Sequence, residues 1–241
     1  MPPERQPDLP GEAPAAEPAP HYHGHRARLR ARFRETGGQG MPDYEILELL
    51  LALAIPRRDV KPLAKDLLAR FGSFANVIAA PLDQLETRDG MGEVAAIALK
   101  TVREGALRLL AADVMQKPVI ASWSALLDYC RARLSREARE ETRVLFLDRK
   151  NVLIADEAHG KGTVDQSPLY IREVVKRALD LAASAVILVH NHPSGDPTPS
   201  RADIEMTRDL DKALKAVGIN LHDHLVIGRQ AHASFKSLGL L

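Results

Sequence analysis

Two histidines and an aspartate form the most informative pattern of this chain. The segment reads His190-Asn191-His192, then seven residues, then Ser200-x-x-Asp203. Because an extended backbone points residues i and i+2 to the same side, His190 and His192 can converge on one ion. Two imidazoles and one carboxylate leave a fourth position open, as in a catalytic zinc site. An open position on zinc turns a bound water into a nucleophile near neutral pH.

A buried strand, a rigid loop and a helix start are predicted to position these three groups. Residues 185–189 are a continuous apolar run, typical of a strand buried on both faces, and they deliver His190 at their C-terminal end. A glycine and two prolines then predict an irregular loop that folds back. Ser200-x-x-Asp203 resembles a helix capping box, so Asp203 is expected in the first turn of the next helix. A capping role for Ser200 does not exclude a role in the site.

The rest of the C-terminal half alternates strand and helix patterns. This alternation over residues 119–241 predicts an α/β domain. The predicted strands are residues 144–148, 152–155, 185–189 and 221–227, and the predicted helices are residues 123–134, 171–181 and 204–217.

The N-terminal half has a different character. Residues 1–24 are rich in Pro and Ala with almost nothing to bury, which predicts a disordered tail. Residues 25–115 show helical periodicity without a strand pattern, which predicts a small all-α domain. The basic run 25–34 is compatible with a solvated helix face and equally with an arm that binds phosphates.

Composition excludes several classes of protein. The net charge is only +1, so the chain as a whole is not a polyanion binder by composition. Cys130 is the single cysteine, which excludes an internal disulfide, Cys₄ and Cys₂His₂ zinc sites, and the zinc nucleobase deaminases with their P-C-x-x-C segment. The chain shows no signal-peptide pattern and no apolar run of transmembrane length, so we expect a cytoplasmic protein without a membrane partner.

The metal pattern resembles a known motif. The segment from His190 to Asp203 matches the H-x-H-x(7)-S-x-x-D motif of the JAMM (MPN+) metalloproteases without departure, and residues 172–179 and 190–197 resemble the bacterial RadC family. The resemblance extends over roughly residues 25–241. It implies an α/β fold in which a JAMM (MPN+) type domain, with a mixed sheet flanked by helices, follows the small all-α domain.

The resemblance also implies a chemistry. One Zn²⁺ per chain would be held by His190, His192 and Asp203, and Ser200 would steady the tetrahedral intermediate. A glutamate upstream would act as general base: Glu141, just before the strand at 144–148, is preferred over its rival Glu157. The implied activity is a zinc-dependent hydrolysis of a peptide or isopeptide bond in an unknown protein or peptide substrate.

A glycine turn in the helical half opens an alternative. Residues 89–96 resemble the turn of a helix-hairpin-helix module, in which backbone N–H groups approach a DNA phosphate. Gly90, Gly92 and Lys100 are the tentative contacts to duplex DNA, although Asp89 and Glu93 would repel a phosphate. A tight turn that needs glycines for its geometry alone explains the pattern equally well. The alternative function is therefore a DNA-binding or repair-associated protein with a structural or vestigial zinc site.

A second H-x-H pattern, His222-Asp223-His224, lies on the predicted strand 221–227. It is compatible with a place behind the metal ligands and with satisfied structural histidines, the second being favoured. The sequence leaves the substrate and the oligomeric state open.

Overall fold

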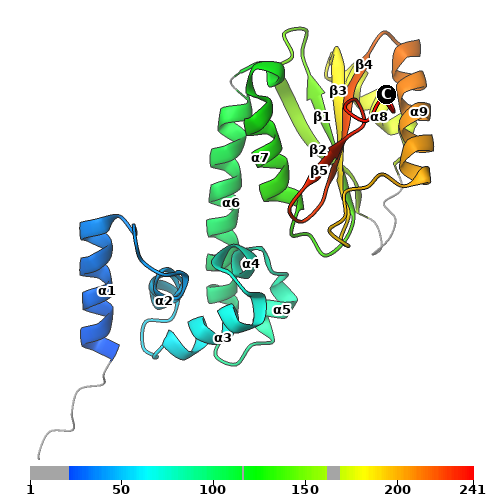
Figure 1. The fold of residues 1–241 in the computed structure, drawn as a ribbon. Coiled ribbons are helices and arrows are strands. Elements are labelled where there is room, and N and C mark those ends of the chain that lie inside the picture. Colours follow the sequence, from blue (N-terminus) through cyan, green and yellow to red (C-terminus); the bar gives the residue numbers. More distant parts are fainter. Residues whose placement is uncertain (1–21, 116, 162–168) are drawn as a thin grey trace, which may run out of the picture. The chain divides into compact units, whose positions relative to one another are not determined.

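The computed structural model describes residues 22–115, 117–161 and 169–241 (Figure 1). The tail expected at residues 1–24 lies outside the described residues, except for its last three, which begin helix α1 (Tyr22–Thr36). The chain divides into two compact units, one up to Lys65 and one from Asp66 onward.

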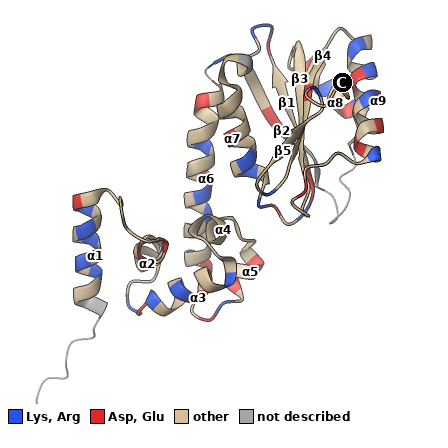
Figure 2. Cartoon of the chain, in the orientation of Figure 1, with Lys and Arg blue, Asp and Glu red and all other residues tan. Residues whose placement is uncertain are grey.

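The first unit consists of α1, α2 (Asp43–Ala54) and the first turn of α3 (Lys61–Phe71). Arg26 of the basic run is buried, and it donates hydrogen bonds to the backbone carbonyls of Ile55, Pro56 and Arg58. The run is therefore not one uniform solvated face. Its exposed basic residues are Arg28, Arg30, Arg32 and Arg34. Figure 2 shows that basic residues recur along α1.

The second unit begins with short helices before a long one. α4 (Phe74–Ala79) and α5 (Leu82–Glu86) precede α6 (Glu93–Met115), so a helix lies on each side of the glycine turn that begins at residue 89. α6 has 23 residues and continues well beyond Lys100.

A five-stranded mixed sheet forms the centre of this unit. Its order is β2-β1-β3-β4-β5: β1 pairs antiparallel with β2 and β3, β3 pairs parallel with β4, and β4 pairs antiparallel with β5. The strands are β1 (Glu141–Leu147), β2 (Leu153–Lys161), β3 (Ala185–Asn191), β4 (Asn220–Ile227) and β5 (His232–Ser234). β5 and the second half of β2 extend beyond the strands that the sequence pattern predicts.

Helices cover both faces of the sheet (Figure 1). On one face, α7 (Trp123–Leu134), the short 3₁₀ helix η1 (Val119–Ser122) and the end of α6 share a core with the odd-numbered residues of β1 and β3, such as Leu145 and Ile187. On the other face, α8 (Ile171–Asp180) and α9 (Arg201–Ala216) share a core with the even-numbered residues. β3 is buried along its whole length, as its apolar run predicts.

The architecture confirms the expected fold, a mixed sheet flanked by helices and preceded by an all-helical region. The division between the two compact units does not coincide with the junction expected between residues 115 and 119. The reason is that α6 packs along α7, so the helices from α4 to α6 belong to the unit that contains the sheet. Among the described residues, no helix is long and apolar enough to cross a membrane.

Candidate metal centre

The structure brings the three expected ligand residues together. The Nε2 atoms of His190 and His192 lie 3.0 Å apart, and each lies 3.4 Å from a carboxylate oxygen of Asp203. One ligand atom from each residue falls within 4.8 Å of the others. His190 lies on β3, His192 just after it, and Asp203 in the first turn of α9, so the site forms at the C-terminal end of the central strand.

A tight loop returns the chain from β3 to α9. The His192 carbonyl accepts from the N–H of Gly195, whose φ is +92° and therefore favours glycine. Arg229 donates its N–H to the Gly195 carbonyl at 3.1 Å, and the buried Gly228 lies directly against that carbonyl. The connection after β4 thus supports the loop that carries His192.

Ser200 and Asp203 form the capping box at the start of α9. The Ser200 side chain accepts from the Asp203 N–H, while the Ser200 N–H and hydroxyl both donate to Oδ2 of Asp203 at 2.7 Å. The cap fixes the orientation of the carboxylate and leaves Oδ1 directed at His190. In this arrangement the Ser200 hydroxyl hydrogen is donated to Asp203, and the oxyanion role implied for Ser200 stays a prediction.

The donor set fits a zinc ion. Nδ1 of His192 lies 2.8 Å from the Asp196 carbonyl oxygen, which only accepts, so Nδ1 carries the hydrogen and Nε2 faces the other ligands. Two imidazole nitrogens and a carboxylate oxygen therefore face one another, and such acceptors repel unless a proton or a cation lies between them. Two histidines and one carboxylate with an open fourth position are a known ligand set of catalytic zinc.

The surroundings shift the pKa values of the three histidines of the site in different directions. Contact with Asp203 is the main cause that raises the pKa of His192, with smaller contributions that include the charge of Glu140. Burial lowers the pKa of His190 to about 4 and the pKa of His224 well below its usual range. Burial alone would raise the pKa of Asp203, but contact with His192, the charge of His190 and hydrogen bonds from Ser200 outweigh it and lower the pKa.

Acid is expected to destabilise the metal-free protein. Between the ordinary histidine pKa of 6.5 and the pKa of His190 at about 4, the unfolded chain binds protons at positions 190 and 224 that the folded chain does not. The free energy of unfolding therefore falls as the pH drops through this window, by up to about 1.4 kcal/mol per pH unit for each group. His192 opposes this slope only near the upper end of the window, because its pKa is raised in the folded state and well below pH 6.5 it is protonated in both states.

Urea unfolding in the presence of a chelator, repeated at several pH values, measures this effect. A His190→Asn variant should show a pH slope that is smaller by about one proton. An identical slope in the variant and the wild type would contradict the prediction.

Glu141 does not face the metal ligands. Its carboxylate lies 2.6 Å from Nη1 of Arg143, whose Nε contacts Asp156 at 2.7 Å, and Tyr129 donates to the same Asp156. Thr142 pairs with His190 across β1 and β3 and so shares its face, which directs the neighbouring Glu141 to the α7 face. This geometry does not fit the expected role of Glu141 as general base.

Glu140 precedes Glu141 by one residue, so the alternation of an extended chain places it on the opposite face, the one that Thr142 shares with His190. Asn191, buried between the two histidines, accepts from the N–H of Glu141 at 2.9 Å and donates to the carbonyl of Arg139 at 3.1 Å. These two bonds hold the backbone on both sides of Glu140, and the charge of Glu140 acts on His192. Glu140 is not among the residues expected from the sequence. The pairing of Thr142 with His190 is what places Glu140, two residues before Thr142, on the His190 side of the alternation.

The rival glutamate has a different partner. Both carboxylate oxygens of Glu157 accept from Arg177 of α8, at 2.6 to 3.0 Å. This ion pair is the main cause that lowers the pKa of Glu157. It directs the carboxylate of Glu157 toward Arg177 of α8.

The second H-x-H pattern splits between two roles. His222 contacts Oδ1 of Asn151 at 2.6 Å, and Asp223 accepts from Ser234, which are structural contacts. Nε2 of His224 instead lies 2.7 Å from Nδ1 of His190, so His224 lies directly behind this candidate ligand. His222 is therefore a structural histidine, while His224 takes the place behind the candidate ligands that the sequence left open.

The glycine turn of the helical region does not present Lys100 to a phosphate. The Lys100 ammonium donates to the carbonyls of Ile78, Ala79 and Ala80 at 2.9 to 3.2 Å, which occupies all three of its N–H groups. Gly90 has a φ of +82°, so the turn needs a glycine there for its geometry alone, and a side chain on Gly92 would meet no neighbouring atom. The expected contact of Lys100 with DNA is thus replaced by a cap on the end of α4.

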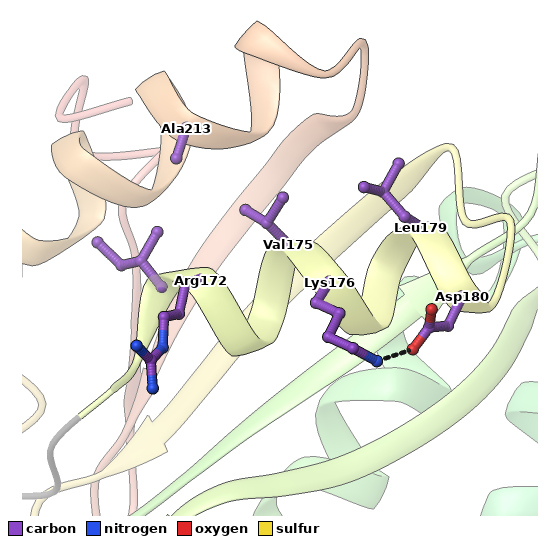
Figure 3. A pocket seen from close by; sticks show the side chains of 7 residues that line it. Arg172, Val175, Lys176, Leu179, Asp180 and Ala213 are labelled. Atoms are coloured by element: carbon purple, nitrogen blue, oxygen red, sulfur yellow. Dashed lines mark hydrogen bonds and ion pairs between the residues drawn. The ribbon is translucent and has the colours of Figure 1, made fainter.

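A shallow hollow between α8 and α9 is separate from these ligands (Figure 3). Apolar side chains such as Val175 and Leu179 line it beside the ion pair of Lys176 and Asp180, whose charged atoms lie 2.6 Å apart. It contains none of the three ligand residues.

Comparison with known protein families agrees with this architecture. The family model described as the RadC-like JAB domain matches residues 120–240, which is half of the 241-residue chain. The matched segment includes the whole sheet, His190, His192 and Asp203. It does not include the helices before η1, so the resemblance expected for residues 25–119 stays a prediction. On the extent of this match, the chain belongs to the family of proteins with a RadC-like JAB domain.

Proposed function

We propose that this protein is a zinc-dependent hydrolase of the JAMM type, acting on a peptide or isopeptide bond. The observation that carries the proposal is the convergence of His190, His192 and Asp203. Two further observations support it: Asn191 holds the backbone on both sides of Glu140, and the charge of Glu140 acts on His192. Zinc bound by these ligands would supply a water of lowered pKa and polarise the scissile carbonyl.

The residues of the chain divide the remaining work. Glu140 accepts the proton of the attacking water and passes it to the leaving amine, which requires its carboxylate to come within hydrogen-bond distance of both. Asp196 and Ser200 hold His192 and Asp203 in their ligand orientations through the bonds at 2.8 and 2.7 Å. Burial of His190 keeps its imidazole neutral, which is the form that binds a metal.

Metal content is the direct test. Purified wild-type protein is expected to contain close to one zinc per chain by elemental analysis, and a His190→Ala/His192→Ala variant to contain almost none. A His222→Ala variant is the matched control, because His222 contacts Asn151 rather than the ligands and its loss should leave the zinc in place. A folded wild type that takes up no zinc when zinc is supplied would contradict the proposal.

The basic residues near the glycine turn do not support DNA binding as a second function. Lys100 is engaged by backbone carbonyls, and Arg88 forms a two-pronged ion pair with Asp66. Duplex DNA as a partner stays a prediction from the sequence.

A further inference from the structure

A chain of hydrogen bonds leads away from the metal ligand His190 into the protein core. Nδ1 of His190 lies 2.7 Å from Nε2 of His224, and Nδ1 of His224 lies 2.6 Å from the hydroxyl oxygen of Thr207. The Thr207 hydroxyl in turn lies 2.5 Å from the backbone carbonyl of Asp203. All three side chains are buried, with at most 1% of each residue exposed, so water does not compete for these bonds.

The far end of the chain fixes its direction. The Asp203 carbonyl oxygen only accepts, and two oxygens 2.5 Å apart repel unless a hydrogen lies between them, so Thr207 donates to it. The hydroxyl has no second hydrogen, and its oxygen must accept from Nδ1–H of His224. A fully buried imidazole between a hydroxyl and another imidazole is neutral. Nε2 of His224 is therefore bare and accepts from Nδ1–H of His190.

We propose that Thr207 and His224 are positioning residues that hold His190 in its Nδ1–H tautomer and so present its bare Nε2 to the metal. The inference rests on the proposed metal site. Without this chain, the hydrogen of His190 could reside on Nε2, which would direct it at His192 only 3.0 Å away and block coordination.

This chain of hydrogen bonds also connects two of the proposed ligands, His190 and Asp203, to each other. It begins at the imidazole of His190 and ends on the backbone of Asp203, whose carboxylate lies 3.4 Å from the same imidazole. The ring of Phe235 stacks on the imidazole of His224 at 4.3 Å between centroids, and the backbone N–H of His224 donates to the Asp223 carboxylate. The imidazole of His224 is thus held in place by contacts on several sides. In metal sites, the loss of a residue that hydrogen-bonds a ligand from behind lowers metal affinity about 10- to 100-fold.

The tautomer is measured on metal-free protein with ¹⁵N-labelled histidine, by long-range ¹H–¹⁵N spectra recorded above the pKa of His192. The expected spectrum of the wild type shows a protonated Nδ1 and a bare Nε2 on His190. Thr207→Val, which removes the hydroxyl but keeps the shape, should mix the two tautomers, whereas Thr207→Ser should restore the wild-type pattern. A wild-type His190 with its hydrogen on Nε2 would overturn the inference without any variant.

Zinc affinity by competition with a chelator is the second readout. Thr207→Val should bind zinc about 10- to 100-fold more weakly, and Thr207→Ser as tightly as the wild type. Thr101→Val is the matched control, because Thr101 donates to the carbonyl four residues earlier in α6, far from the ligands in sequence. Unchanged affinity in Thr207→Val would overturn the inference. A wild type without zinc affinity would count against the proposed function, while the spectrum of the metal-free protein would still decide the tautomer.

Discussion

Glu140→Gln is expected to keep its zinc and to hydrolyse substrate about 10²- to 10⁴-fold more slowly than the wild type. The amide is nearly the size of the carboxylate but accepts no proton from water. Asn191 holds the backbone through Arg139 and Glu141, so the substitution should leave the backbone at residue 140 in place. The two histidines and Asp203 are untouched, which is why metal content should not change.

Glu141→Gln is the matched control for this prediction. It makes the same chemical change one residue later, where the carboxylate pairs with Arg143 on the other face of the sheet. Its hydrolytic rate should stay near that of the wild type. The substrate would first be found by screening peptides and isopeptide-linked conjugates with wild-type protein, with chelated protein as the blank. The reverse pattern, an inactive Glu141→Gln and an active Glu140→Gln, would return the general-base role to Glu141.

The convergence of the candidate metal ligands could be predicted from the sequence because local rules position them. His190 and His192 converge through the two-residue period of an extended chain, and Asp203 is fixed by the capping box that it forms with Ser200. These relations span few residues, so spacing alone predicts them. The apolar run before His190 likewise predicted a buried central strand, which is what β3 is.

The proposed general base could not be predicted in the same way, because its orientation depends on strand register. Moving by one residue along a strand exchanges the two faces of a sheet. β1 is apolar on both faces, with Val144 and Leu145 both buried, so its sequence does not show which of Glu140 and Glu141 faces His190. The pairing of Thr142 with His190 decides this, and it is a long-range contact.

The partners of His224 and Lys100 could not be predicted from the sequence for a related reason. A histidine on a buried strand and a lysine on a helix have no local signal for their partners, which come from α9 and from the end of α4. His224 bonds the Thr207 hydroxyl and Lys100 bonds the carbonyls at the end of α4, and neither contact can be inferred from the residues nearby in sequence.

Gly228→Ala is expected to weaken zinc binding on the order of 10- to 100-fold although residue 228 contacts no ligand. A Cβ at this position would lie 2.4 Å from the Gly195 carbonyl oxygen and 2.9 Å from Cδ of Pro197. Neither a backbone oxygen nor a proline ring can rotate away, so the loop between β3 and α9 must move. The same crowding should lower the free energy of unfolding by about 1 to 3 kcal/mol.

The loop cannot move without the ligand that it carries. His192 is oriented by the Asp196 carbonyl, which follows Gly195 directly, so a displaced Gly195 moves the acceptor that holds this imidazole. Gly105→Ala is the matched control. It adds the same Cβ in the middle of α6, where no atom beyond the helix's own backbone lies within 4 Å, and it should leave zinc affinity unchanged while raising stability by about 0.5 to 1 kcal/mol. Chelator competition and urea unfolding on both variants measure the two effects. If Gly228→Ala bound zinc as tightly as Gly105→Ala, the loop would not be what fixes His192, and the Asp196 carbonyl would have to follow the imidazole rather than hold it.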